Sequence, residues 1–591
     1  MNNYKAFIQQ LLSLANNSLQ PLEQVILDYI ITQVLEGLEI GSTCLNINNL
    51  DLKDTKENIS LNDILNILER SNLVGYYNLK EDCLPIKPLT LMQIPFVDAK
   101  KNILYITRHF YYELEIAKKL AKLQVPSKVD KNLVENLLKA LKNKIYSGFP
   151  NFEQLNAINT SLFNKLSIIT GGPGTGKTTT VVLLLWVLIQ LYDNLNIQVC
   201  APTGKASARI KESIYNNILI LSDSLGLDIS FLQKKIDEIN FGTIHKLLNY
   251  KINDIYFNYN ANNPLNVDIL IIDEASMISL PLFYKLLNAV EQNSIKHIVF
   301  LGDKNQLSSV EEGYVFASLI KNYSREVFSR NKNNIVSELV ISNRSNLEIS
   351  KFAENILYNR LDLVINSLVY TNNIKMKDPD LSLILRELFD SNNEINIINY
   401  LNFIKTSKNI SFATLFQIFR QLAILCLTRI GKLGVINLNN QIEILVKKYL
   451  RESGVWYTGR PIIILENDYN LGLYNGDIGI CIMKDNKALI LFEDKREFIP
   501  ELLPKYELAY ALTIHKSQGS EFDNVIIIIP ENNKEKSNIN TMLSKELLYT
   551  AVTRAKKTIL MYFQDDSVKT LLNSNIERQT GLDYLLPSIN L

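Results

Sequence analysis

The sequence has few of the residues that build metal centres or disulfide frameworks. It holds five cysteines, scattered singly without CxxC spacing, and only four histidines. This pattern argues against a zinc or iron–sulfur site and for a reducing compartment, so we expect a cytoplasmic protein. The net charge is only +1, so any surface that binds nucleic acid must be a local patch.

Long apolar segments are also missing. The longest apolar run considered as a membrane span, 181–189, is too short to cross a bilayer. The first residues lack the basic and apolar regions of a signal peptide. What the chain does have is 591 residues, 47% of them hydrophobic. A chain of this size and composition is expected to form three or four domains with substantial cores.

Strand-like apolar segments alternate with helical patterns in two regions, which predicts α/β domains with parallel sheets. The first region is 131–335, and the second is split into 336–455 and 506–591. Between the halves of the second, 456–505 has short strands separated by turn residues, typical of a small inserted β-barrel. Residues 1–130 show helical periodicity without recognisable chemistry and predict an N-terminal helical domain.

The strongest chemical signal is a phosphate-binding loop pattern, in which Gly171 is followed after four residues by Gly176-Lys177-Thr178. Glycines let backbone N–H groups turn toward phosphates, Lys177 reaches the β and γ oxygens, and the Thr178 hydroxyl is expected to bind Mg²⁺. The expected ATP-binding residues of this loop are Gly171, Gly172, Pro173, Gly174, Thr175, Gly176, Lys177, Thr178 and Thr179.

Acidic and amide residues follow two further strand candidates. Asp273 and Glu274 end "DILIIDE"; we expect Asp273 to coordinate Mg²⁺ and Glu274 to orient the attacking water. Gln306 follows "HIVFLGD" and is expected to sense the γ-phosphate. Small hydroxylated and basic residues in two other loops are expected to contact DNA backbone phosphates, namely Thr203, Lys205, Thr243 and His245.

Six motifs occur in the order found in superfamily 1 helicases of the 5′-to-3′ branch. They are "GGPGTGKTTT", "APTGKASAR", "DEASMI", "LGDKNQLSSVEEG", "HKSQGSEF" and "YTAVTRA". Within that branch, "GRPIIILENDYNLGLYNGDIGI" resembles a stretch typical of the RecD family. The resemblance runs from about Gln154 to the C-terminus. It implies two RecA-like domains of the P-loop NTPase type, with ATP between them, single-stranded DNA across their tops and an SH3-like inserted barrel.

"HKSQGSEF" (515–522) resembles helicase motif V, and "YTAVTRA" (549–555) resembles motif VI. The likeness implies that Ser517 and Gln518 couple DNA to the ATP site, and that His515 and Lys516 face DNA phosphates. It also implies that Arg554 acts as an arginine finger on the γ-phosphate.

A second arginine of the ATP site is expected in motif IV, where Arg344 in "SNRSN" is favoured over Arg420. Asn343 stands where many superfamily 1 members place an aromatic residue that stacks on adenine. Gln154 is therefore the better candidate for adenine recognition.

The resemblance implies an ATP- and Mg²⁺-dependent 5′-to-3′ DNA helicase that processes duplex ends for recombinational repair. Its partners would be RecB-like and RecC-like subunits, as in exodeoxyribonuclease V, with the N-terminal region as a docking domain. A free-standing 5′-to-3′ helicase and a non-catalytic architectural subunit remain as alternatives, although Lys177, Asp273 and Arg554 argue against the latter. A nuclease site on Asp477, Glu493 and Lys495 is disfavoured, because these residues read as a charged hairpin.

Overall fold

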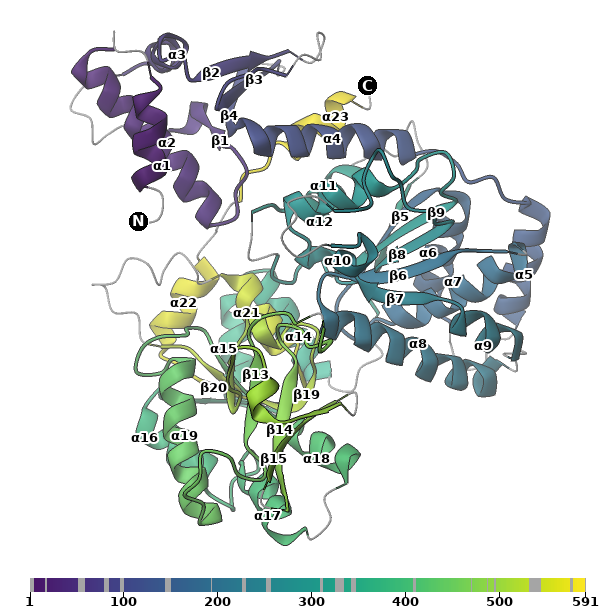
Figure 1. Cartoon of the computed structure of the whole chain (residues 1–591), viewed down its shortest axis with the longest axis vertical. Coiled ribbons are helices and arrows are strands. Elements are labelled where there is room, and N and C mark those ends of the chain that lie inside the picture. Colours follow the sequence, from purple (N-terminus) through teal and green to yellow (C-terminus); the bar gives the residue numbers. More distant parts are fainter. Residues whose placement is uncertain are drawn as a thin grey trace.

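Four β-sheets organise the chain in the computed structural model (Figure 1). An N-terminal domain packs on the first of two parallel-sheet domains, and a small antiparallel sheet is inserted in the second. The described residues are 5–15, 19–50, 59–78, 84–95, 100–143, 150–192, 194–225, 230–250, 257–308, 312–324, 334–341, 347–371, 373–407, 411–468, 470–485, 487–493, 496–530, 544–573 and 578–589.

The first RecA-like domain is built on a parallel sheet with the strand order β10-β5-β9-β8-β6-β7. Its strands are β5 (Leu166–Gly171), β6 (Ile197–Ala201), β7 (Asn240–Thr243), β8 (Ile269–Ile272), β9 (His297–Gly302) and β10 (Val336–Leu339). Its helices are α5 (Lys131–Asn143), α6 (Phe152–Phe163), α7 (Lys177–Leu191), α8 (Gly204–Leu225), α9 (Ser230–Asp237), α10 (Ile244–Leu247), α11 (Leu280–Ala289) and α12 (Val315–Tyr323). Because β10 pairs with β5, residues 336–339 belong to this sheet and not to the second domain, where the sequence had placed them.

Both faces of this sheet are covered, which explains its uninterrupted apolar strands. In β8, Ile269 and Ile271 point into one core together with α7, while Leu270 and Ile272 point into the opposite core together with α11. Successive side chains of a strand alternate between faces, so a run of four apolar residues serves both cores.

The second RecA-like domain also has an all-parallel sheet, with the order β11-β20-β19-β12-β18. Its strands are β11 (Ile374–Lys377), β12 (Leu422–Cys426), β18 (Ala511–Thr513), β19 (Phe522–Ile528) and β20 (Ala555–Tyr562). Its helices are α14 (Leu347–Leu357), α15 (Leu361–Tyr370), α16 (Leu381–Leu388), α17 (Ile398–Thr406), α18 (Phe412–Phe419), α19 (Val435–Leu450), α21 (Lys545–Val552) and α22 (Asp565–Asn573). The two parallel sheets confirm the predicted α/β class.

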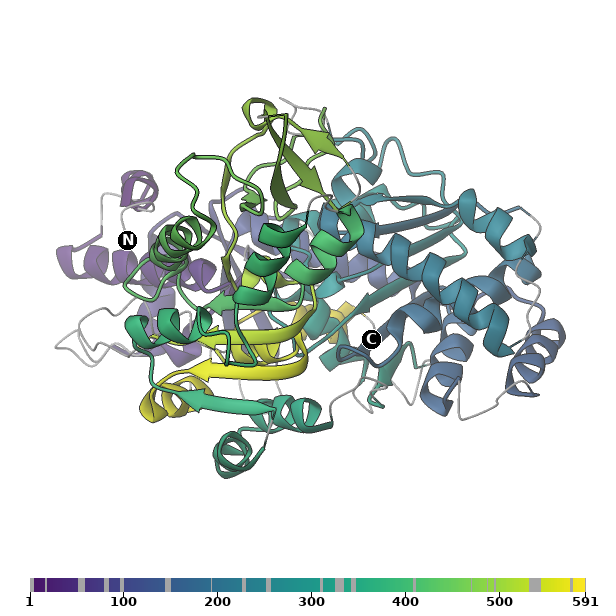
Figure 2. The ribbon, with the colours of Figure 1, turned by 90° about the horizontal axis from the view of Figure 1, so that it is seen from below.

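The insert is an antiparallel sheet with the order β16-β15-β14-β13-β17, and Figure 2 shows it above the second parallel-sheet domain, beside the first. Its strands are β13 (Pro461–Ile464), β14 (Ile478–Lys484), β15 (Lys487–Phe492), β16 (Glu497–Phe498) and β17 (Tyr506–Leu508). The insert therefore extends beyond the predicted end at 505. Within the described residues, β16 and β17 are unpaired edges, so the pairing does not close the predicted SH3-like barrel.

The N-terminal domain differs from the helical domain expected from the sequence. It contains helices and a mixed four-stranded sheet with the order β1-β4-β3-β2. Short apolar strands such as "NILYI" are buried on both faces and cannot be told from helix by periodicity alone. The elements are α1 (Lys5–Ser13), α2 (Pro21–Glu39), β1 (Leu45–Asn46), α3 (Leu61–Arg70), β2 (Val74–Tyr77), β3 (Leu89–Pro95), β4 (Lys100–Ile106) and α4 (Thr107–Leu123).

The C-terminal segment 578–589 leaves the second domain and packs on the N-terminal one, with α23 (Leu582–Ile589) beside α4 (Figure 1). Glu113 of α4 lies at the centre of this contact and is fully buried. Its carboxylate accepts hydrogen bonds from the hydroxyls of Thr43 (2.5 Å), Thr580 (2.6 Å) and Tyr105 (3.2 Å). The C-terminal segment is thus held against the N-terminal domain.

Replacing Glu113 by Gln should make the free energy of unfolding less dependent on pH. Burial raises the pKa of Glu113 from about 4.5 to about 7. The folded chain therefore binds more protons than the unfolded chain between these pH values, and stability falls as the pH rises through this window, by about 3 kcal/mol. Denaturant titrations at pH 5 and pH 8 should show a larger difference for the wild type than for Glu113→Gln; equal differences would contradict this assignment.

Two further features bear on function. No helix in the described part of the chain is long and apolar enough to cross a membrane.

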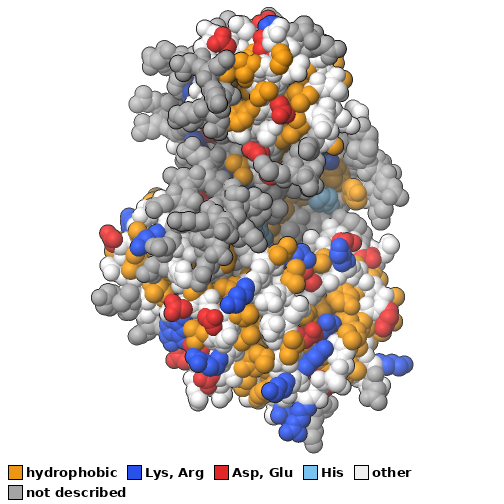
Figure 3. Space-filling view, turned by 90° about the vertical axis from the view of Figure 1, so that its left-hand side faces the viewer, with side chains coloured by type: hydrophobic (Ala, Val, Ile, Leu, Met, Phe, Trp, Pro, Cys, Tyr) orange, Lys and Arg blue, Asp and Glu red, His pale blue; other side chains and the backbone are white. Residues whose placement is uncertain are grey.

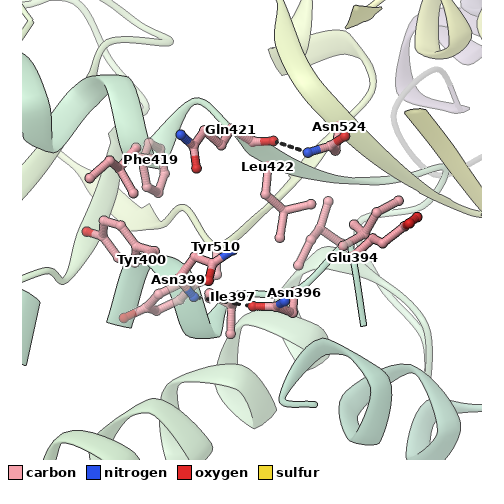
Figure 4. Close-up of a pocket in the computed structure, with 13 residues that line it drawn as sticks. Glu394, Asn396, Ile397, Asn399, Tyr400, Phe419, Gln421, Leu422, Tyr510 and Asn524 are labelled. Carbon is pink, nitrogen blue, oxygen red and sulfur yellow. Dashed lines mark hydrogen bonds between the residues drawn. The ribbon is translucent and has the colours of Figure 1, made fainter. Parts of the chain in front are cut away.

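A cavity of about 50 Å³ in the second domain is lined by Tyr400, Phe419, Tyr510 and Asn524, among others (Figure 4). This cavity is too small for a nucleotide, so the candidate site lies elsewhere, at the junction of the two parallel-sheet domains.

Candidate nucleotide and nucleic-acid site

The phosphate-binding loop connects β5 to α7 in the first domain. Gly174 and Gly176 have positive φ angles of 80° and 85°, which only glycine adopts without strain. The half-buried Lys177 folds back over the loop, and its Nζ donates to the carbonyls of Gly171 (2.6 Å) and Gly172 (3.0 Å). The loop therefore holds the ammonium group at the mouth of a helix N-terminus, where an anion is favoured.

Three loop residues make contacts of their own. The Thr175 hydroxyl donates to Gly172 (2.8 Å) and shapes the turn, and Thr178 is half-buried at the start of α7. The Thr179 hydroxyl instead donates to Asn217 of α8 (2.9 Å), so this predicted ATP contact is engaged in packing between helices.

Gln154 lies directly against the loop. A Cβ atom on Gly176 would stand 2.3 Å from Gln154 Nε2, and this fully buried nitrogen has no hydrogen-bond partner in the described structure. The Oε1 atom caps α6 by accepting from the backbone N–H of Asn151 (3.0 Å). A buried donor without a partner is costly, so this nitrogen is free to donate to a ligand at the loop.

The acidic pair follows β8, next to the phosphate loop. Burial and the neighbouring carboxylate of Glu274 raise the pKa of Asp273, whereas Lys177 and Arg209 lower it. Glu274 has a φ of 51°, an uncommon conformation for a residue other than glycine, and such strain is typical of functional sites. An acidic pair beside a phosphate loop has the chemistry to bind a phosphate-bound cation and to orient a water.

The loop 303–308, after β9 of the first domain, is hydrogen-bonded to the second parallel-sheet domain. Leu307 donates its backbone N–H to the Thr550 hydroxyl (3.0 Å), and its carbonyl accepts from Gln518 Nε2 (3.1 Å). Tyr549 donates its hydroxyl to Asp303 (3.0 Å), whose pKa is raised by burial. Gln306 is buried in the same loop. Motifs V and VI therefore contact the first domain through this loop.

The motif V residues divide into separate roles. Ser517 is fully buried, and its hydroxyl donates to the carbonyl of Ile514 (2.7 Å), so it shapes the turn, whereas Gln518 contacts the first domain. Lys516 forms an ion pair with Glu507, which also binds Arg429 (2.9 Å). Burial lowers the pKa of His515.

Of the two arginines expected at the ATP site, the structure describes Arg554 only. The buried Arg554 donates to the carbonyls of Thr550 (3.1 Å) and Ser520 (3.1 Å), both in its own domain. Arg344 and Asn343 lie outside the described residues. Arg420 is paired with Glu493 of the insert (2.5 Å).

Two of the predicted DNA-binding residues cap helices. The Thr203 hydroxyl accepts from Ala206 N–H (3.2 Å), and the Thr243 hydroxyl accepts from Lys246 N–H (3.1 Å). His245 packs at 5.8 Å, centroid to centroid, from the ring of Phe257. Burial lowers the pKa of Lys205 to about 8.

The residues considered for a nuclease are engaged in structural contacts. Glu493 pairs with Arg420, and Asp477 accepts from the backbone N–H of Tyr474 (2.9 Å). Lys495 lies outside the described residues. Among the described residues, no group of three or more His, Cys, Asp or Glu could hold a metal ion.

Sequence reasoning missed one prominent residue. Arg209, the last residue of "APTGKASAR", donates to the carbonyl of Gly519 (2.6 Å) and pairs with Glu521. Because these partners lie more than 300 positions away in the sequence, the motif pattern alone gives no sign of the contact.

Comparisons with known proteins agree with this geometry. Residues 154–312 match the family model of an AAA domain, and 508–562 match that of a UvrD-like helicase C-terminal domain. The RecBCD enzyme subunit RecD of Haemophilus influenzae is 34% identical over 73% of this chain and 72% of its own length. The ATP-dependent RecD2 DNA helicase of Deinococcus radiodurans is 26% identical over 68% of this chain and 48% of its own length. A crystal structure of Bacteroides Pif1 bound to ssDNA covers 70% of this chain and 93% of its own chain, with 18% identity and a TM-score of 0.37.

A phosphate-binding loop, an acidic pair and a second parallel-sheet domain that is hydrogen-bonded to the neighbouring loop 303–308 define a P-loop helicase that uses a nucleotide. The identity to the Haemophilus subunit over nearly three quarters of both chains is more specific. This chain belongs to the RecD family.

Proposed function

We propose that the chain is an ATP- and Mg²⁺-dependent DNA helicase that moves 5′ to 3′ along single-stranded DNA, as the RecD-type subunit of a complex with RecB-like and RecC-like partners. One observation carries the helicase proposal. The loop 303–308 beside the phosphate loop is hydrogen-bonded to motif V through Gln518 and to motif VI through Thr550. A movement of this loop on hydrolysis would therefore shift the motif V loop relative to DNA. Membership of the RecD family supports the direction of movement.

We expect the residues of the loop to bind ATP through an exchange of side-chain partners. Lys177 would exchange the carbonyls of Gly171 and Gly172 for the β and γ oxygens, since a charged acceptor makes the stronger hydrogen bond. The unpartnered Nε2 of Gln154 would donate to an acceptor nitrogen of the adenine ring. These contacts would orient the γ-phosphate toward the acidic pair.

The donor set near the γ-phosphate fits a divalent cation. Mg²⁺ prefers oxygen ligands, and the hydroxyl of Thr178 and the carboxylate of Asp273 would hold it together with phosphate oxygens. When bound, Mg²⁺ neutralises phosphate charge. Glu274 would orient the attacking water, and Arg554 would leave its carbonyl partners to stabilise the charge on the γ-phosphate.

The N-terminal domain offers a surface for the partner subunits. Its first two helices expose large apolar side chains, and Figure 3 shows hydrophobic side chains gathered on this part of the molecule. Leu14 is 63% exposed and Val25 is 59% exposed, with Phe7 and Leu22 also exposed. Apolar patches of this kind support protein docking.

The proposed function is tested by ATP hydrolysis with and without single-stranded DNA, and by co-purification with RecB-like and RecC-like subunits from the same source. We expect hydrolysis to rise in the presence of DNA and the three chains to elute together. If DNA had no effect on hydrolysis, the helicase proposal would be rejected. If the chain unwound DNA alone at full speed without binding the partners, the free-standing helicase would replace the subunit role.

Gln518→Ala and Ser517→Ala should affect different properties, although the two residues are adjacent. Removing the amide of Gln518 breaks the bond to Leu307, so stimulation by DNA should fall by about fivefold or more. Removing the Ser517 hydroxyl breaks a buried bond within the turn and should cost about 1 kcal/mol of stability. Hydrolysis assays and thermal melts separate the two effects; identical profiles for both variants would contradict the assigned roles.

A further inference from the structure

Arg209 extends from α8 of the first domain to the motif V loop of the second. Its Nη1 atom donates to the carbonyl of Gly519 (2.6 Å), and Nη2 pairs with the carboxylate of Glu521. The other carboxylate oxygen of Glu521 lies 3.7 Å from Nζ of Lys556. The Glu521 side chain is only 12% exposed. Glu521 is therefore held from both domains.

The same guanidinium acts on the acidic pair. Although burial works against the charged form, the carboxylates of Glu521, Glu274 and Asp273 together raise the pKa of Arg209. Arg209 thus links the motif V loop electrostatically to the carboxylates of the nucleotide site.

Arg554 binds the middle residue of the same tripeptide. Its Nη1 atom donates to the carbonyl of Ser520 (3.1 Å), between the two residues that Arg209 holds. Two arginines, one from each parallel-sheet domain, therefore hold residues 519–521. If Arg554 moves to the γ-phosphate, Arg209 still ties this tripeptide to the first domain.

Building on the proposed function, we propose that Arg209 is a positioning residue that makes hydrolysis at the acidic pair respond to DNA bound at motif V. A strand that shifts residues 519–521 would shift the guanidinium with them. Its distance from Asp273 and Glu274 would then differ between the DNA-bound and DNA-free states. Such a differential contact is what coupling between two sites requires.

The test uses the full chain and measures ATP turnover with and without saturating oligo-dT. For Arg209→Ala, the ratio of the two turnover rates should fall about tenfold, within the usual range of coupling between sites. Glu521→Gln should lower the ratio similarly, and the double variant should be little worse than either single one, because both remove the same contact. Arg209→Lys keeps the charge but not the two-pronged geometry, and should retain an intermediate ratio.

Lys211→Ala is the matched control, since it removes an exposed cation from the same helix and should leave the ratio unchanged. If Arg209→Ala kept the wild-type ratio while its melting temperature fell, Arg209 would be a static interface contact and the inference would be overturned. Should Arg209→Ala fail to fold, Glu521→Gln tests the contact from the other domain. A wild-type chain that oligo-dT does not stimulate would reject the proposed function itself.

Discussion

Lys177→Ala should lower the rate of ATP hydrolysis in the presence of single-stranded DNA by about a thousandfold. The ammonium group is held over the phosphate loop by two carbonyls and would compensate the charge of the β and γ oxygens in a site with little water. Its loss should cost about 4 kcal/mol at the transition state. Because the ammonium group donates to two backbone carbonyls of the loop and Lys177 is only half-buried, we expect the fold to be preserved.

Steady-state hydrolysis by purified Lys177→Ala measures this effect, with a thermal melt to verify folding. Lys142→Ala removes an exposed lysine from α5 of the same domain and should behave as the wild type. A Lys177→Ala chain with near wild-type turnover at saturating DNA would show that the phosphate loop is not the site of hydrolysis.

Arg554→Ala should lower hydrolysis by about 10³-fold or more while ATP binding persists. In the described structure the guanidinium is hydrogen-bonded to the carbonyls of Thr550 and Ser520. We therefore expect it to contribute little to the binding of ATP in the ground state. An arginine that reaches the γ-phosphate only in the transition state affects turnover rather than affinity.

The measurement is a comparison of single-turnover hydrolysis with the equilibrium binding of a non-hydrolysable ATP analogue. Arg554→Lys should not restore the rate, because one ammonium cannot replace a planar guanidinium that binds two oxygens. Equal losses in binding and in hydrolysis would instead place Arg554 in the ground-state binding site.

The parts of the site that are continuous in sequence were predictable, and those that depend on distant contacts were not. The glycines and Lys177 of the phosphate loop follow one strand and open one helix, so their geometry is encoded locally. The link between Leu307 and Gln518 joins residues more than 200 positions apart, and no spacing rule could reveal it. The hydrogen bond that buries the Ser517 hydroxyl within its own turn is likewise not visible in the motif, and the coupling role of Ser517 stays a prediction.

In the fold, too, locally encoded features were predictable from the sequence, and features that depend on distant pairing were not. The parallel sheets were predictable because strands buried on both faces produce uninterrupted apolar runs such as "ILII" in β8. The N-terminal sheet was missed because β3 and β4 are equally short and apolar but lie within a region rich in helices. The edge strand β10 follows a polar stretch, so only its pairing with β5 shows to which domain it belongs.

The most direct test of the account is ATP-dependent strand displacement on duplexes that carry only a 5′ or only a 3′ single-stranded tail. The chain should be assayed alone and with RecB-like and RecC-like subunits in which the other motor is inactivated. The account predicts unwinding of the 5′-tailed duplex, its loss with Lys177→Ala, and little displacement from the 3′ tail. Unwinding confined to 3′-tailed duplexes would contradict it.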